Sequence, residues 1–316
     1  MKCRICGNKD GNAPFEAREM MFGTRERFNY FECNSCGCVQ ITDIPDDLAR
    51  FYAADYYSFK PVHRGNFAIA LLKRIKDRSA VFRRGRLGRF LNRFYGSLYL
   101  EQLALLEPSR TTAILDVGCG AGKFLHALRE IGFTRLLGSD PHLTSDVTYE
   151  NGLVLKKSRL EELTGPFDIV TMNHSFEHTE EPLAVLRQCY DLLDTRGFCC
   201  VTTPVAGSFA CRKYRANWVQ LDAPRHLHVH SPESINHLAK EVGFTIWKTI
   251  YNSAAFQFWG SEQYAMDMPL MDTRSYGSNR RHSVFTDRQI ADFNLSARNL
   301  NATGSGDQAT FFLRKS

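Results

Sequence analysis

The sequence has no apolar run that could cross a bilayer and no apolar stretch behind its N-terminus. Along all 316 residues, polar or charged side chains interrupt each hydrophobic segment before it reaches the roughly 20 residues that a membrane-spanning helix needs. Residues Met1 to Arg4 lack the apolar core of a secretory signal peptide. We therefore expect a globular, cytoplasmic protein with a large core and one or two domains.

Without an export signal, the ten cysteines favour reduced thiols and metal binding over disulfides. Two CxxCG motifs stand 26 residues apart near the N-terminus and supply Cys3, Cys6, Cys33 and Cys36. Their spacing predicts a zinc ribbon in which Zn²⁺ is structural, because four protein ligands leave no coordination position for a substrate. Cys38 is an alternative to Cys36. Metal binding of about 10 to 16 kcal/mol would supply the folding energy of so small a module.

Acidic residues are nearly absent from residues 64–93, where ten Lys or Arg accompany Asp77 alone. This segment accounts for the net charge of +6, because the rest of the chain is slightly acidic. Apolar residues recur at helical spacing between Phe67 and Tyr99, which predicts two helices interrupted near Gly85. Such a segment can attract nucleic acid, an anionic glycan or an anionic membrane surface. The alternatives are a solvated connecting helix and packing of its apolar stripe on the catalytic domain.

The most specific functional signal is the segment ILDVGCGAGKFL at residues 114–125. It predicts a buried strand that turns into a helix through Gly118, Gly120 and Gly122, with Asp116 just before the turn. Glycines let the backbone approach a ligand closely. The spacing G-x-G-x-G differs from the G-x-G-x-x-G of dinucleotide-binding enzymes. The turn indicates a pocket for a nucleoside-bearing cofactor.

This turn resembles motif I of the class I methyltransferases that use S-adenosylmethionine. The resemblance implies a Rossmann-like α/β sheet with Asp140, at the end of a strand over 136–140, on the ribose hydroxyls of the cofactor. Arg159 stands where relatives often have an acid that contacts adenine, so that contact is assigned to the Leu160 backbone or to Glu161. The cofactor residues implied in this way are Asp116, Gly118, Cys119, Gly120, Gly122, Asp140, Leu160, Asn173 and His174.

Strands and helices alternate after residue 107, which predicts a parallel sheet. Further strands are expected over 153–158, 167–173, 197–204 and 244–251, and residues 308–315 would close a terminal hairpin. We therefore divide the chain into a zinc-ribbon module with an aromatic tail (1–60), a basic helical linker (61–106) and a methyltransferase domain (107–316).

Two histidine-bearing segments are candidates for catalysis. Residues 173–182 resemble the N-x-x-x-E-H-x-x-x-P signature of small-molecule methyltransferases, which implies that His178 points into the active site. Residues 222–230 resemble a P-R-H-L stretch in bacterial methyltransferases of polysaccharide biosynthesis, which implies that His226 borders the substrate pocket. Arg225 and Asp222 are therefore candidates for substrate binding. Either histidine can act as general base, which typically raises the reaction rate roughly 100- to 10,000-fold. Asp222 or Glu177 would orient the histidine ring. The alternative is a histidine that is satisfied by local hydrogen bonds.

His226, His228 and His230 would share one face of a strand. They are a disfavoured alternative for a metal site, and His228 and His230 are expected to be ordinary loop or core residues.

Aromatic residues mark two further candidates for substrate binding. Residues 48–59 resemble a tyrosine-containing stretch that lies over the cofactor pocket of related enzymes, which implicates Tyr56 and Tyr57, unless these aromatics only pack the ribbon on the core. The insertion 252–306 contains Trp259 and Tyr264 and a predicted helix near 287–300. Long insertions often build an acceptor pocket or lid, and the alternative here is an oligomer interface.

Together these features predict methyl transfer from S-adenosylmethionine to a hydroxyl of a sugar or related small molecule in cell-surface polysaccharide biosynthesis. An RNA methyltransferase is the alternative, but residues 173–176 lack the Asn/Asp-Pro-Pro-aromatic motif of base-methylating relatives. A noncatalytic binding protein is disfavoured because the glycine turn and Asp140 are intact. Sugar C-methyltransferases share a zinc module but carry a further C-terminal domain, so methylation of oxygen is preferred. The basic segment 64–93 is a candidate for peripheral contact with an anionic membrane, and the oligomeric state stays open.

Overall fold

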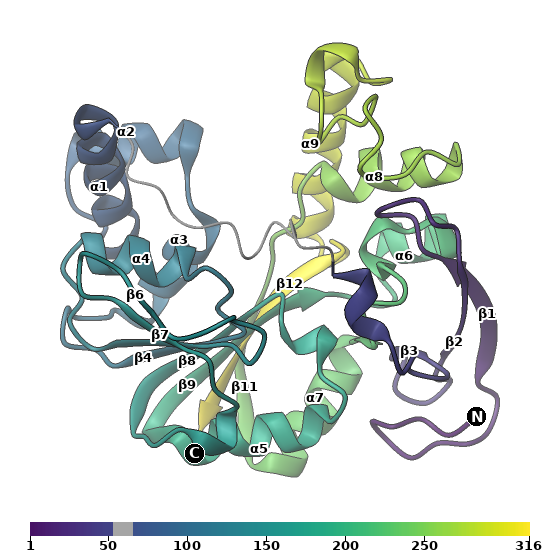
Figure 1. Cartoon of the computed structure of the whole chain (residues 1–316), viewed down its shortest axis with the longest axis horizontal. Coiled ribbons are helices and arrows are strands. Elements are labelled where there is room, and N and C mark those ends of the chain that lie inside the picture. Colours follow the sequence, from purple (N-terminus) through teal and green to yellow (C-terminus); the bar gives the residue numbers. More distant parts are fainter. Residues whose placement is uncertain (53–65) are drawn as a thin grey trace.

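The computed structural model describes residues 1–52 and 66–316, which are organised by two β-sheets (Figure 1). The larger sheet has eight strands in the order β11-β12-β9-β8-β4-β5-β7-β6, and the smaller has the order β1-β2-β3-β10. The strands of the larger sheet are β4 (Ile114–Val117), β5 (Leu136–Ser139), β6 (Val147–Thr148), β7 (Val154–Lys156), β8 (Phe167–Asn173), β9 (Leu193–Pro204), β11 (Phe244–Tyr251) and β12 (Gln308–Lys315). The smaller sheet contains β1 (Ala13–Arg18), β2 (Arg27–Glu32), β3 (Val39–Ile41) and β10 (His228–Val229).

The helices fall before, between and after these strands. They are α1 (Phe67–Phe82), α2 (Arg86–Tyr95), α3 (Leu98–Leu103), α4 (Lys123–Glu130), α5 (Pro182–Leu192), α6 (Phe209–Tyr214), α7 (Pro232–Val242), α8 (Phe256–Ala265) and α9 (Asp287–Ala302). Within residues 1–52 and 66–316, none of them is both long and apolar enough to cross a membrane.

The larger sheet confirms the predicted α/β fold. Strands β9, β8, β4, β5 and β7 run parallel, whereas β12 is antiparallel between β9 and β11. The predicted terminal hairpin is present, with Tyr251 opposite Ala309. The fifth strand differs from the expectation because β9 begins at Leu193, directly after α5, and not at Gly197.

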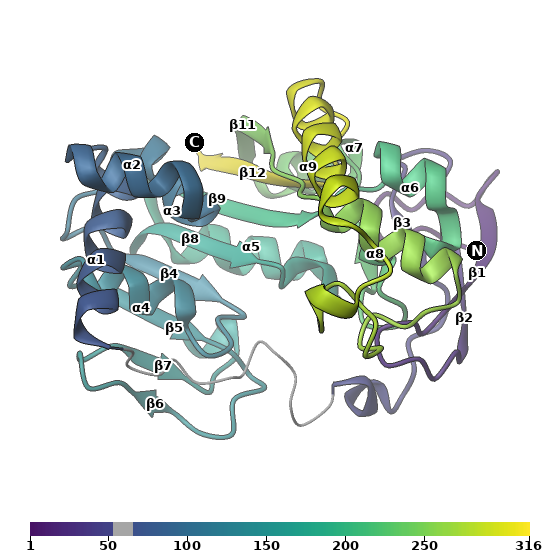
Figure 2. The ribbon, with the colours of Figure 1, turned by 90° about the horizontal axis from the view of Figure 1, so that it is seen from above.

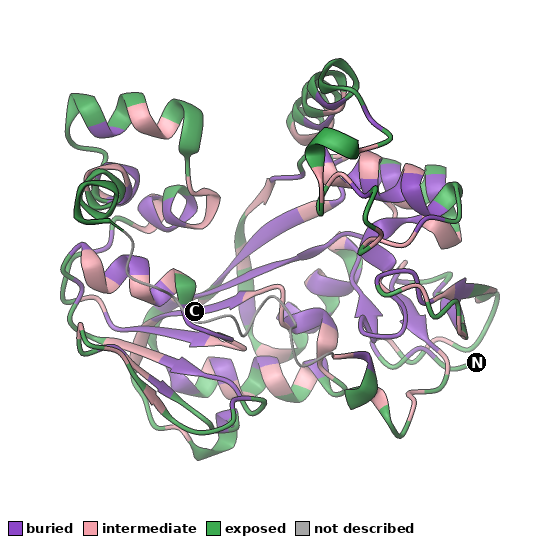
Figure 3. Ribbon diagram, turned by 45° about the horizontal axis from the view of Figure 1, so that its top comes forward, coloured by how far each residue is buried: buried purple, intermediate pink, exposed green. Residues whose placement is uncertain are grey.

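Helices cover both faces of this sheet. Successive side chains of a strand point to opposite faces, and apolar side chains point to both. Leu115 and Val170 point into a core shared with α5 and α7, while their neighbours Ile114 and Ile169 join α3 and α4 on the other face. Figure 3 shows the resulting band of buried strands between more exposed helices. This arrangement brings the carboxyl ends of β4, β5 and β8 to one edge, where open α/β sheets bind their ligands.

The N-terminal ribbon is tied to the catalytic half of the chain by β10. His228 pairs with Gln40 and Val229 with Val39. Arg4 Nε lies 3.1 Å from His228 Nε2, and the Ser231 hydroxyl donates to the Cys36 carbonyl. The segment next to the candidate base His226 therefore belongs to the ribbon sheet. The boundary expected at residues 60 and 61 lies outside the described residues, so the division into three parts stays a prediction.

The basic segment forms the two predicted helices, α1 and α2. The turn between them contains Gly85 at a φ of +90°, and the short helix α3 follows. Two perpendicular views place α1 and α2 at the end of the molecule opposite the ribbon sheet (Figures 1 and 2).

Candidate active site

The glycine turn after β4 adopts a backbone conformation that side chains rarely allow. Gly118, Gly120 and Gly122 have φ values of +68°, +50° and +67°. A Cβ on Gly118 would lie 2.4 Å from Ser175 Cβ, so the turn packs directly against the loop that follows β8. Both features require glycine and leave the backbone of the turn at the carboxyl edge of the sheet.

Asp140 follows β5 beside this turn. Its Oδ2 accepts a hydrogen bond from the Gly120 N–H at 2.9 Å, and its Oδ1 accepts from the His142 N–H at 2.9 Å. Only 5% of the residue is exposed. A carboxylate has about four acceptor positions, so Asp140 can still accept hydrogen bonds from a ligand.

Asp116 is buried at the end of β4. Its Oδ1 accepts from Thr171 Oγ1 at 2.6 Å and from Asn173 Nδ2 at 3.2 Å. Burial raises the pKa of Asp116 to about 7, although both hydrogen bonds oppose the shift. Asp116 thus connects β4 to Asn173, another predicted cofactor residue, at the end of β8.

The segment at the predicted adenine contact lies next to β5. Ser139 Oγ and Ser158 Oγ are 3.0 Å apart, which holds the following turn, Leu160–Glu162, near Asp140. Leu160 is buried. Arg159 and Glu161 face solvent, with Nη1 and Oε1 3.8 Å apart. The Leu160 backbone therefore remains the better placed of the two predicted adenine contacts.

A buried glutamate anchors the histidine-rich loop after β8. Glu177 has no exposed surface; its Oε1 lies 3.3 Å from His174 Nδ1, and its Oε2 accepts from Thr203 Oγ1 at 3.1 Å. Burial alone would raise the pKa of Glu177, but the His174 hydrogen bond and the nearby His226 and His178 lower it to about 2. Glu177 is therefore an acceptor that fixes the position of the loop.

The structure brings the two candidate bases, His178 and His226, together. Their ring centroids are 4.8 Å apart. His178 Nδ1 lies 2.8 Å from the Arg225 carbonyl, and His226 Nδ1 lies 2.8 Å from the Gln220 carbonyl. A carbonyl accepts only from a protonated ring nitrogen, so each neutral ring keeps its lone pair on Nε2.

The expected orienting role of Asp222 or Glu177 is corrected by this geometry. Both carboxylates lie 3.9 Å from His226 Nε2, on the reactive side of the ring, and the Gln220 carbonyl orients the ring through Nδ1. The carboxylates can instead stabilise a proton on Nε2. Burial and the neighbouring His226 lower the pKa of His178 to about 4, so His178 is a weak proton acceptor at neutral pH.

Arg225 does not border the substrate as expected, because its side chain has no exposed surface. Its Nη2 lies 3.0 Å from Glu19 Oε1 and 2.6 Å from Asp222 Oδ1, and its Nη1 donates to the Phe51 carbonyl at 3.2 Å. Burial alone would raise the pKa of Asp222, but the Arg225 guanidinium lowers it. Arg225 therefore acts on the site indirectly, because its ion pair with Asp222 fixes the carboxylate that lies near His226 Nε2.

Replacing Arg225 with methionine should destabilise the fold by about 3 to 5 kcal/mol, because Glu19 and Asp222 would lose their shared buried partner. Urea unfolding of both proteins measures the difference. Arg187→Met is the matched control: Arg187 is 56% exposed and lies 3.7 Å from Glu241, so a change below about 1 kcal/mol is expected. Equal effects of the two substitutions would contradict the buried ion cluster.

Tyr52 reaches the site from the ribbon module and was not singled out from the sequence. Its ring lies 6.1 Å from the His178 ring and 6.4 Å from the His142 ring, and its hydroxyl is 3.1 Å from His178 Nδ1. The aromatic density of residues 48–59 was the available signal, but it was assigned to Tyr56 and Tyr57. Those two residues lie outside the described residues.

The two aromatic candidates of the insertion lie on α8. Trp259 packs between Phe256 and Tyr276, with ring centroids 4.9 and 5.5 Å away. Tyr264 is buried, and its hydroxyl has no hydrogen-bond partner in the described part of the chain. A buried hydroxyl without a partner is costly, so Tyr264 is the better candidate to meet a polar ligand group.

The four predicted zinc ligands converge. All four Sγ atoms lie within 4.8 Å of one another, with 3.7 Å between Cys3 and Cys36 and 3.6 Å between Cys6 and Cys33. Tetrahedral Zn²⁺ with Zn–S bonds of about 2.3 Å places sulfurs about 3.8 Å apart, so the geometry fits. Cys38 is not in this group; its thiol faces the Val39 carbonyl at 3.6 Å.

His226, His228 and His230 do not form a metal-binding group in residues 1–52 and 66–316. His228 contacts Arg4 and the Thr179 carbonyl, and His230 stacks on Phe176 at 4.7 Å. Among the described residues, the other group with ligand spacing is Glu177, His178 and His226, whose donor atoms lie within 4.8 Å of one another.

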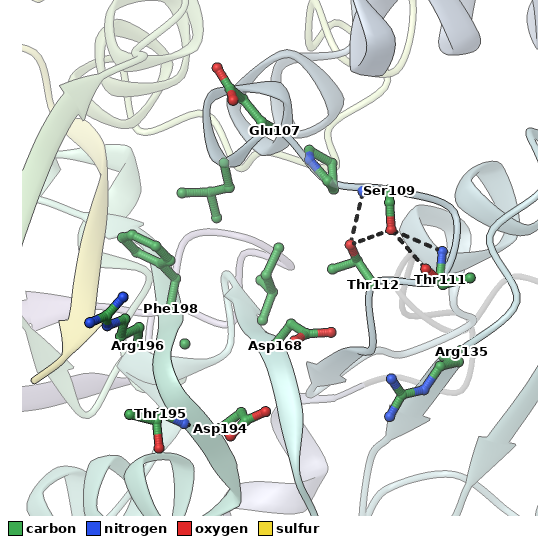
Figure 4. Close-up of a pocket in the computed structure, with 14 residues that line it drawn as sticks. Glu107, Ser109, Thr111, Thr112, Arg135, Asp168, Asp194, Thr195, Arg196 and Phe198 are labelled. Carbon is green, nitrogen blue, oxygen red and sulfur yellow. Dashed lines mark hydrogen bonds between the residues drawn. The ribbon is translucent and has the colours of Figure 1, made fainter.

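A surface hollow of about 430 Å³ lies elsewhere (Figure 4). It is lined by Thr112, Arg135 and Asp168, at the amino ends of β4, β5 and β8, whereas the glycine turn and the histidines are at the carboxyl ends. Two of its lining residues are hydrogen-bonded to each other, because the Ser109 N–H donates to Thr112 Oγ1 at 2.9 Å. We therefore place the active site at the carboxyl edge and not in this hollow.

Acid should destabilise the fold below pH 6.5. Burial lowers the pKa of His228 to about 3 and of His178 and His230 to about 4, so the unfolded state binds more protons from pH 6.5 down to about 4. Stability then falls as pH is lowered, by about 1.4 kcal/mol per pH unit and group. Asp116 offsets part of this loss: its pKa is raised to about 7, so its carboxyl binds one proton in the folded state that the unfolded state does not bind over this pH range. Urea unfolding between pH 7.5 and 4.5 tests this.

His228→Gln should reduce that pH slope by one proton, whereas His237→Gln, at an exposed position on α7, should leave it unchanged. A free energy of unfolding that is constant from pH 6.5 to 4.5 would contradict the expectation that the buried histidines destabilise the fold in acid.

A family model described as "Methyltransferase domain" matches residues 82–249. The mitochondrial ubiquinone biosynthesis O-methyltransferase of Saccharomyces cerevisiae is 30% identical over 28% of this chain and 32% of its own length. The ubiquinone biosynthesis O-methyltransferase of Caulobacter vibrioides is 29% identical over 50% of this chain and 62% of its own length. The chain thus spans less than two thirds of either relative.

Among solved structures, a SAM-dependent methyltransferase from Archaeoglobus fulgidus aligns with 73% of this chain and 100% of its own, at 21% identity and a TM-score of 0.42. The family model covers more than half of the sequence and includes the glycine turn, Asp140 and both histidines. The chain therefore belongs to the methyltransferase domain family.

Proposed function

We propose that this protein transfers a methyl group from S-adenosylmethionine to a hydroxyl group of a small molecule. The observation that carries the proposal is the proximity of two elements at one sheet edge. The glycine turn with Asp140 follows β4 and β5. His178 follows β8 and His226 lies in the neighbouring loop, and both rings carry their lone pair on Nε2. A cofactor pocket beside a proton acceptor is what methylation of a hydroxyl requires.

The residues at the turn fit S-adenosylmethionine. Asp140 keeps acceptor positions for ribose hydroxyls, and the positive-φ turn over Gly118, Gly120 and Gly122 leaves the backbone open to close approach. Cys119, Asn173 and His174 complete the proposed lining, together with Asp116 and the Leu160 backbone. When bound, the cofactor supplies an electrophilic methyl group. Alignment of donor and acceptor is worth up to about 7 to 11 kcal/mol of the barrier.

His226 is the proposed general base. The acceptor hydroxyl gives its proton to His226 Nε2 while its oxygen forms the bond to the methyl carbon, and the bond from that carbon to sulfur breaks. Glu177 and Asp222, each 3.9 Å from Nε2, stabilise the proton there. The lowered pKa of His178 makes it a weak proton acceptor, and its Nδ1 bonds to the Arg225 carbonyl. We therefore assign His178 to positioning the methyl acceptor and the loop that contains Arg225.

The resemblance of residues 222–230 to polysaccharide-biosynthesis methyltransferases favours a sugar hydroxyl as the methyl acceptor. The names of the curated relatives, ubiquinone biosynthesis O-methyltransferases, also favour oxygen as the methylated atom and suggest a second acceptor class. Incubation with methyl-labelled S-adenosylmethionine and either nucleotide sugars or ubiquinone precursors separates the two. Label in a hydroxyl-bearing small molecule is the expected result. Parallel incubations with amino acceptors and with RNA are the controls, and label in these alone would contradict the proposal.

We also propose that Cys3, Cys6, Cys33 and Cys36 hold one structural Zn²⁺. Four thiolates at tetrahedral spacing support this assignment, and they leave the metal no position for a substrate.

A further inference from the structure

Helix α1 begins with a projecting apolar end. Every residue from Asn66 to Arg74 is exposed, and the first six helical residues are the sequence FAIALL. Phe67 is 82% exposed and Ile69 65% exposed. Apolar side chains in all directions of a helix end are unusual in contact with water. Lys73 and Arg74 follow directly.

Helix α2 lies on α1 and keeps its apolar face outward. Its one buried residue is Gly88, where a Cβ would lie 2.3 Å from Ser79 Cβ of α1. Leu87, Phe90 and Phe94 recur at the spacing of one helical face, and they are 53%, 61% and 63% exposed. The glycine contact therefore fixes which face of α2 is turned outward.

Cations adjoin this apolar face. Arg86, Arg89 and Arg93 are exposed and form the neighbouring stripe of α2 at the same helical spacing. Of the sixteen exposed large hydrophobic side chains in the described residues, eight lie between Phe67 and Tyr95. Residues 64–93 contain ten Lys or Arg and one acid.

We propose that α1 and α2 dock this protein on an anionic lipid surface. Leu, Ile and Phe side chains enter the acyl boundary while Lys and Arg stay at the headgroups, which is how interfacial amphipathic helices bind membranes. The inference does not depend on the proposed methyl transfer. Arg74 Nε bonds to the Glu130 carbonyl at 3.0 Å and attaches this docking surface to α4, the helix after the glycine turn.

Two other occupants fit the surface less well. A second copy of the same face would set one basic stripe against another, because a two-fold interface repeats the same patch. RNA would be attracted to the cations, but it offers no apolar phase for the exposed aliphatic side chains Ile69, Leu71 and Leu72. Of these three occupants, an anionic lipid surface matches both the exposed apolar side chains and the neighbouring cations.

The test is sedimentation of the full chain with phosphatidylcholine vesicles that contain ~0 to 40% phosphatidylglycerol, at ~0.1 and ~0.5 M NaCl. The Debye length is about 10 Å at the lower salt concentration and shorter at the higher one, so electrostatic attraction is screened more strongly there. We expect binding that rises with phosphatidylglycerol and falls with salt. The double variant Phe90→Ser/Phe94→Ser and the triple variant Arg86→Gln/Arg89→Gln/Arg93→Gln should each weaken binding by about 10-fold or more.

Matched controls lie on other exposed surfaces. Leu295→Ser on α9 and the double variant Arg280→Gln/Arg281→Gln change exposed residues of the same kinds and should leave vesicle binding unchanged. Three results would overturn the proposal: no binding to phosphatidylglycerol vesicles, retention on RNA that depends on the arginines but not on Phe90 and Phe94, or a dimer that the Phe variant dissociates without any lipid binding.

Discussion

The His226→Ala variant is expected to lose about 100- to 10,000-fold in kcat, the usual contribution of a positioned general base. Its Kd for S-adenosylmethionine should stay within a few-fold of the parent value, because the glycine turn and Asp140 are unaltered. The loss follows from the geometry of Nε2, which faces Glu177 and Asp222 at 3.9 Å while Gln220 holds the ring through Nδ1. Steady-state kinetics and calorimetry measure the two quantities.

Two controls separate this role from a structural one. His237→Ala, on the exposed side of α7, should leave kcat unchanged. Added imidazole should partly restore activity to His226→Ala, because it can take the acceptor proton in place of the missing ring. An unchanged kcat in His226→Ala would show that His226 is not the base and would transfer that role to His178.

The Cys33→Ser variant is expected to lose its bound zinc and most of the stability of the ribbon, since structural zinc sites in isolated peptides contribute about 10 to 16 kcal/mol. The effect should extend to activity. The Tyr30 hydroxyl on β2 donates to the His226 carbonyl at 3.0 Å, and β3 pairs with β10 two residues beyond. Elemental analysis gives zinc per chain, and circular dichroism follows thermal unfolding.

Cys211→Ser is the matched control for that variant, because Cys211 is a partly exposed thiol on α6 outside the cluster. It should retain one zinc per chain. A parent protein that contains no zinc, or a Cys33→Ser variant that keeps it, would contradict the structural metal site.

The cofactor half of the site could be predicted from the sequence because its determinants are local. Asp116, Gly118 and the start of α4 lie within one strand-turn-helix unit, and Asp140 ends the next strand of the parallel sheet. Periodicity also located the break between α1 and α2 near Gly85. The start of β9 was predicted four residues too late, at Gly197, because the strand follows α5 directly at Leu193 with no intervening turn.

The acceptor half could not be predicted to the same depth because long-range contacts build it. Arg225 was expected at the substrate, but its partner Glu19 lies 206 positions earlier in the chain. The orienting acceptor of His226 is a backbone carbonyl, which no residue type reveals. The pairing of β10 with the zinc ribbon joins segments that the sequence presents as separate modules.

The most direct test of this account is titration of the protein with S-adenosylmethionine in a calorimeter. We predict one site per chain and a Kd that is at least about 10-fold weaker in Asp140→Ala, since a hydrogen bond to a charged group is worth about 1.5 to 3 kcal/mol. Asp292→Ala, on the exposed face of α9, should match the parent. No binding heat in the parent protein, or the same Kd in Asp140→Ala, would contradict the cofactor site on which the proposed function depends.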